Sequence, residues 1–181
     1  ILDPNQLSVF LKEKGMKIGF GAMGKGYAAN RAKAIMQKMM GIHGGLVNAG
    51  GDLIAWGKNN NPAGWSVKIA DPKDKNKMIA YLQLQNQAIV TSGDYEKFVF
   101  FEDIRYAHII DPRTGYPTTG IKSVTIISPD AELSDALATA VFVMGKEKGL
   151  VLINEINGVE GLIITDKDEL LTTTNLKLNY Y

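Results

Sequence analysis

The feature that most constrains the fold is a run of short β-rich segments bounded on both sides by helical segments. Apolar and small residues recur at helical spacing over residues 26–40, and Gly41 follows in the position where helices usually stop. Helical patterning returns over residues 133–144 and 147–156. The predicted strands are 46–48, 53–56, 65–70, 78–84, 88–91, 98–101, 106–110, 123–127, 161–165 and 170–174. Strands in the middle with helices on either side predict the α+β class.

Turn and loop residues divide these strands. The residues from Ala49 to Asp52 read Ala-Gly-Gly-Asp and predict a hairpin with a Gly-Gly turn. Residues 59–62 and 71–77 are the clearest loops, and neither is long enough to link two domains. We therefore expect residues 1–181 to form one domain.

Composition removes several classes of function. The 181 residues include no Cys and two His, and 20 Lys and Arg balance 19 Asp and Glu. The lack of Cys excludes disulfides, thiolate metal sites and cysteine nucleophiles, and the balanced charge argues against a nucleic-acid partner. Any metal would sit on oxygen ligands, which favours Mg²⁺ or Ca²⁺. No apolar run approaches the ~20 residues of a membrane span.

A glycine-rich stretch, residues 19–27, leads into the first helix with four glycines and Lys25. Exposed amides at a helix N-terminus can bind phosphate. The spacing fits neither a Walker A loop nor a dinucleotide fingerprint. A turn needed only for tight packing is the alternative.

Two further stretches carry polar groups at strand ends. Residues 91–95 gather small hydroxyl side chains, a pattern that turn chemistry alone also produces. His108 ends a strand and enters a rigid loop, residues 108–117, where it could reach a cleft or be structural. We interpret the other histidine, His43, as a loop residue.

Asp135 and Thr139 lie four residues apart in the second helix, so both face the same way. A carboxylate and a hydroxyl among small apolar residues are costly to bury unless they bind something, and a hard cation is one solution. The alternative is that Asp135 caps its own helix.

In this order, these segments resemble the ApbE family, the flavin transferases once called thiamine biosynthesis lipoproteins. The matching segments are residues 21–30, 46–52, 91–95, 108–117, 123–127 and 134–145. The resemblance implies a mixed, largely antiparallel sheet and an enzyme that uses FAD as substrate with Mg²⁺. Such an enzyme moves FMN onto a Thr or Ser hydroxyl of a partner protein, an electron-transport subunit, and releases AMP. Some relatives instead hydrolyse FAD to FMN and AMP.

The resemblance also implies roles for individual residues. The metal ligands would be Asp135, Thr139 and the backbone carbonyl of Gly24, and His108 would be the catalytic base. Asp52 and Asp111 are interpreted as turn-organising residues. The residues lining the FAD site would be Gly21, Lys25, Tyr27, Ser92 and the backbone near Ile109.

This sequence departs from the family pattern, which usually has Asp at Gly19, Gly at Ala22, Ala at Gly24 and Asp at Asn30. Family members are also close to twice as long, with a signal sequence and a lipidated cysteine before this region. We therefore expect a C-terminal portion of a longer protein on the outer side of the cell envelope, reaching the membrane only through that anchor. A non-catalytic FAD-binding protein and a structural domain that has lost its site are the other hypotheses.

Overall fold

The computed structural model describes residues 1–59, 61–70, 77–94, 98–102 and 104–179. Its centre is a six-stranded sheet in the order β12-β11-β10-β7-β4-β3, and every pairing in that sheet is antiparallel. The strands are β3 (Gly44–Ala49), β4 (Asp52–Gly57), β7 (Ala88–Gly93), β10 (Ile121–Ser128), β11 (Glu160–Thr165) and β12 (Leu170–Thr172). The predicted α+β class with largely antiparallel strands is confirmed.

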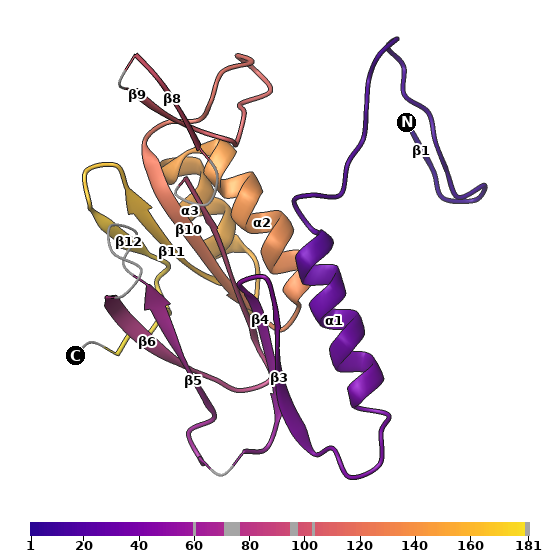
Figure 1. The fold of residues 1–181 in the computed structure, drawn as a ribbon, viewed down its shortest axis with the longest axis vertical. Coiled ribbons are helices and arrows are strands. Elements are labelled where there is room, and N and C mark those ends of the chain that lie inside the picture. The colour runs from indigo at the N-terminus through magenta and orange to yellow at the C-terminus, as the bar shows by residue number, and fades with distance from the viewer. Residues whose placement is uncertain (60, 71–76, 95–97, 103, 180–181) are drawn as a thin grey trace.

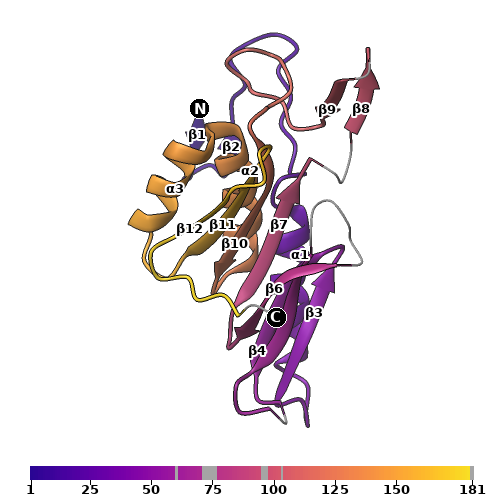
Figure 2. The ribbon, with the colours of Figure 1, turned by 90° about the vertical axis from the view of Figure 1, so that its left-hand side faces the viewer.

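Helices cover one face of this sheet, and a two-stranded ribbon covers the other (Figures 1 and 2). The helices are α1 (Gly24–Met36), α2 (Ala131–Met144) and α3 (Lys146–Glu155), and the ribbon pairs β5 (Trp65–Ala70) with β6 (Met78–Leu84). Successive side chains of a strand point to opposite faces, so Val90 packs toward α2 while Ile89 packs toward the ribbon. This alternation divides the core into two layers.

Two smaller ribbons lie outside these layers. β1 (Leu2–Asp3) pairs with β2 (Ser8–Val9) in an N-terminal segment that stands away from the body, a ribbon the sequence did not predict (Figure 1). β8 (Phe98–Phe101) pairs with β9 (Ile104–Ala107) beside the loop that carries His108.

Most element boundaries agree with the sequence, and the exceptions have local causes. The first helix ends at Met36 instead of residue 40, because the next residues tighten into turns before Gly41 adopts φ +83°. β9 covers 104–107, not 106–110, because Ile109 already accepts a bond from the Thr118 amide in a reversing loop. Tyr95 and all but Lys77 of the predicted loop 71–77 lie outside the described residues.

The Gly-Gly hairpin is confirmed. Gly50 and Gly51 have φ of +64° and +104°, values that side chains other than glycine rarely adopt. The Gly51 amide donates to the Asn48 side chain, so Asn48 organises the turn and leaves Asp52 at the start of β4. In the part of the chain described here, no helix combines the length and apolar character needed to cross a bilayer.

Candidate functional site

A cavity of about 380 Å³ lies where the glycine-rich turn, α1, α2, the end of β7 and the loop after β9 meet. Its walls include residues from four separated segments of the sequence. They are Gly21, Ala22, Lys25, Ser92, Gly93, His108, Ile109, Ile110, Asp135, Thr139 and Val143. The structure thus brings together seven of the nine residues singled out from the sequence.

The other two, Gly24 and Tyr27, line a neighbouring apolar pocket with Phe20, Met23 and Glu132. Gly24 is the first residue of α1, so the two hollows lie on either side of the same helix start. Tyr27 is about half exposed there.

The floor of the cavity is formed by α2 and the end of β7. Asp135 is only 2% exposed, and its Oδ2 accepts a hydrogen bond of 3.0 Å from the Gly26 amide. The Thr139 hydroxyl lies 3.3 Å from the Ser92 hydroxyl, and either oxygen could donate. One helical turn therefore presents a carboxylate and a hydroxyl to the cavity, as their spacing predicts.

This floor depends on a close approach between α1 and α2. A Cβ on Gly26 would lie 2.2 Å from the carbonyl oxygen of Ala131, so only glycine fits without displacing backbone. The same approach brings the Gly26 amide within reach of Asp135. The glycine-rich stretch thus serves both packing and the site, where the sequence left these as alternatives.

Asp130, not Asp135, caps α2. The Asp130 carboxylate accepts from the Leu133 amide at 2.9 Å and from the Asn30 side-chain amide at 2.9 Å. Burial would raise the pKa of the Asp130 carboxyl, but these hydrogen bonds outweigh it and hold the pKa below its usual value. The alternative interpretation of Asp135 as the cap of α2 is therefore wrong. Its carboxylate instead belongs to the lining of the cavity.

Asn30 explains one departure from the family pattern. Its Nδ2 donates to Asp130, while its Oδ1 accepts from the Ala131 amide at 3.1 Å. A carboxylate at this position could accept the second bond but could not donate the first, and it would face the charge of Asp130. Asn30 does not line the cavity, so the change from Asp there removes no carboxylate from it.

Behind the cavity wall lies a buried carboxylate whose place beside the site the sequence did not predict. Asp52 is fully buried, and its Oδ1 is 2.9 Å from the Lys25 Nζ. Burial raises the pKa of Asp52 to about 7; Lys25 opposes the rise and the neighbouring Asp135 adds to it. Its interpretation as a turn-organising residue is wrong because Asn48 fills that role. The one sequence signal was a carboxylate entering a strand otherwise made of apolar residues.

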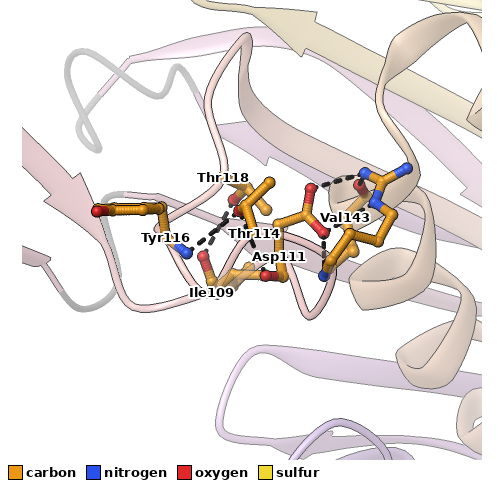
Figure 3. Close-up of polar contacts among 7 residues, drawn as sticks. Ile109, Asp111, Thr114, Tyr116, Thr118 and Val143 are labelled. Carbon is orange, nitrogen blue, oxygen red and sulfur yellow. Dashed lines mark hydrogen bonds and ion pairs between the residues drawn. The ribbon is translucent and has the colours of Figure 1, made fainter.

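The loop after β9 forms the rim of the cavity. His108 is exposed there, and the backbone turns back on itself where Ile110 bridges to Pro117. Asp111 organises the turn, as predicted: it accepts from the amide and guanidinium of Arg113, and these contacts lower the pKa of its carboxyl (Figure 3). The Arg113 guanidinium also donates to the Val143 carbonyl at 3.0 Å, which ties the loop to the end of α2.

The donor set of the cavity suits a hard cation. Among the described residues, no three His, Cys, Asp or Glu side chains gather into a metal cluster. Two buried carboxylates, Asp52 and Asp135, nevertheless lie close enough to influence each other, and the buried Oδ2 of Asp52 has no hydrogen-bond partner among the residues described. Carboxylate and hydroxyl oxygens are the ligands that Mg²⁺ prefers, so the residues present fit such an ion.

Comparison with known proteins gives this geometry a context. Residues 1–163 match the ApbE family. The chain is 36% identical over 167 residues to the FAD:protein FMN transferase of Treponema pallidum, covering 87% of this chain and 46% of that protein. It is 31% identical over 182 aligned positions to the FAD:protein FMN transferase of Klebsiella pneumoniae, and the match covers 99% of this chain and 55% of that protein.

Solved structures agree. The fold is similar to the crystal structure of the ApbE protein from Thermotoga maritima, with a TM-score of 0.86 and 36% identity over 96% of this chain and 56% of that one. For the flavin transferase ApbE from Vibrio cholerae, the TM-score is 0.72 and the identity 30%, and the match covers 84% of this chain and 49% of that one. The chain spans about half the length of the curated relatives it matches.

Proposed function

Since the chain belongs to the ApbE family, we propose that it carries the phosphoryl-transfer site of an FAD:protein FMN transferase. In the proposed reaction, the hydroxyl of a Thr or Ser in a partner protein attacks the FMN phosphorus of FAD. A new phosphoester bond forms, the bond to the AMP phosphate breaks, and AMP leaves. The observation that carries the proposal is that His108, Ser92, Asp135 and Thr139 line one cavity although they come from three separated segments.

His108 is the proposed base. It lies at the exposed rim, where an acceptor protein could bring its hydroxyl, and imidazole is the side chain best suited to exchange a proton near neutral pH. His108 would take the hydroxyl proton as the new bond forms. Residues 109–118, which follow His108, form a closed turn, and this turn fixes the backbone next to the histidine.

The floor of the cavity would hold the diphosphate. Asp135 and Thr139, with the Gly24 carbonyl, are the proposed ligands of Mg²⁺, which when bound would neutralise the diphosphate and stabilise charge on the departing phosphate. Lys25 would bind an anionic oxygen directly. Gly21, Tyr27, Ser92 and the Ile109 backbone are the remaining proposed contacts to FAD.

The acceptor and the compartment are also proposals. We infer an electron-transport subunit as the acceptor and the outer side of the cell envelope as the location, both supported by family membership.

The test is to incubate the protein with FAD, Mg²⁺ and a candidate acceptor and to look for a covalently fluorescent acceptor after denaturation. His108→Ala should slow transfer by roughly 10²–10⁴-fold, the usual contribution of a general base. His43→Ala is the matched control, because His43 is exposed and does not line the cavity.

Other results would support other functions. Release of FMN and AMP without labelling would indicate an FAD pyrophosphatase. Binding of FAD with no turnover would indicate a flavin-binding protein, and no binding would indicate a structural domain without a site.

A further inference from the structure

We propose that Asp52 is a positioning residue that holds the Lys25 ammonium at the cavity wall, ready to bind a diphosphate oxygen. The proposal rests on the proposed function, because the diphosphate is the ligand that the ammonium would meet. Asp52 itself does not line the cavity and would act only through Lys25.

The ion pair is asymmetric in a way that suits this role. The Asp52 side chain is 1% exposed, whereas that of Lys25 is 37% exposed and lines the cavity. The 2.9 Å contact between Lys25 Nζ and Asp52 Oδ1 therefore joins a buried anchor to a partly accessible cation.

The surroundings restrict the lysine along its length. A Cβ on Gly50 would lie 3.7 Å from Lys25 Cδ, so the β3–β4 turn runs beside the aliphatic part of the side chain. A free lysine side chain has about 2 kcal/mol of rotamer entropy, so holding it in place before the ligand arrives reduces the cost of binding. Both the turn and Asp52 belong to one hairpin, which places them together.

A purely structural role would be better served by other residues. The Oδ2 of Asp52 is buried without a hydrogen-bond partner among the described residues, and Asp135 lies next to it. Burying a half-satisfied carboxylate beside a second one costs stability, and an apolar side chain would avoid that cost. The carboxylate is explained if its purpose is to fix the charge of Lys25.

The test measures binding of ADP, as a diphosphate probe, and of adenosine, which lacks phosphate, to the wild-type chain and variants. Asp52→Asn and Lys25→Met should each weaken ADP binding about tenfold, and the double variant should lose no more than Lys25→Met alone. Adenosine binding should not change. A variant that merely damaged the structure would instead weaken the binding of both ADP and adenosine. Neutralising the pair Lys122–Asp168, joined at 2.6 Å outside the cavity, is the matched control and should leave ADP binding unchanged.

The outcomes separate the two proposals. If the wild-type chain binds FAD and ADP but Asp52→Asn binds ADP equally well, or if the losses add, the role of Asp52 is overturned while the proposed function stands. If the wild-type chain binds neither, both are overturned.

A second comparison covers the case in which Asp52→Asn does not fold. Lys25→Arg, which can still pair with Asp52, should keep ADP binding within about threefold, whereas Lys25→Met should not. An equal loss in both variants would overturn the role of the pair.

Discussion

The floor and the rim of the cavity are built in opposite ways. Next to the floor, Lys25 in the cavity wall reaches Asp52 across 27 positions of sequence, and Gly26 reaches Asp135 on the floor across 109. At the rim, Asp111 binds Arg113 only two residues away, in an exposed turn. The floor therefore exists only when α1, β4 and α2 are packed, whereas the rim turn is specified locally. Changes on the floor should disturb stability and function together, and changes at the rim should stay local.

The largest effect should come from Asp135→Ala. Removing the proposed metal ligand should forfeit several kcal/mol of transition-state stabilisation, or about 10³-fold in the rate of FMN transfer. The measurement is the transfer rate as Mg²⁺ is titrated, with Glu147→Ala on the exposed part of α3 as control. A rate near that of the wild type at ordinary Mg²⁺ concentrations would show that Asp135 is not a ligand.

Gly26→Ala tests the packing that the floor requires. The new methyl would overlap the Ala131 carbonyl at 2.2 Å, so we expect a loss of about 3 kcal/mol in unfolding free energy. Gly24→Ala is the control two residues away, because a Cβ added there would meet nothing within 4 Å. It should leave the unfolding free energy unchanged or raise it by up to about 1 kcal/mol. Denaturant unfolding compares the two, and equal effects would mean that the α1–α2 contact is not tight.

Asp130→Ala removes the cap of α2 together with the bond from Asn30. We expect a loss of about 1 kcal/mol in unfolding free energy, the usual cost of losing a cap. Asp130→Asn keeps a side-chain acceptor and should lose less. If the alanine variant is as stable as the wild type, neither the cap nor the hydrogen bond from Asn30 to Asp130 contributes measurably to the unfolding free energy.

The same residue gives a pH dependence with a definite sign. The hydrogen bonds that outweigh burial lower the pKa of Asp130 in the folded state, so its contribution is complete above the unfolded pKa of about 3.9. That contribution is lost as pH falls through the lower folded value. Unfolding free energies of wild type and Asp130→Asn, measured between neutral and acid pH, should therefore converge toward low pH; curves that stay parallel would contradict this.

The smallest effect should come from Arg113→Met at the rim. The pair with Asp111 is exposed, so the midpoint of thermal unfolding should not change measurably. The amides of residues 114–116 should exchange hydrogen faster, because the turn loses its contact to Val143. A large fall in the unfolding midpoint would show that the rim is not independent of the core.

Much of the secondary structure was predictable, because it depends on short-range patterns. The bounds of β5, β6 and β8 agree with alternation and β-branched or aromatic content read from the sequence. The Gly-Gly hairpin followed from backbone conformations open to glycine. The end of α1 and the placement of β9 were missed because both depend on where the chain reverses.

The sequence by itself determined which groups could serve the site: oxygen ligands without Cys, one histidine entering a rigid loop, and Asp135 one helical turn from Thr139. Only the tertiary structure decided how they are used. It made Asp130 the cap, so that Asp135 faces the cavity, and it buried Asp52 behind Lys25. Local spacing fixes which side chains share a helix face, but burial and charge pairing depend on segments that meet only when the sheet and helices pack.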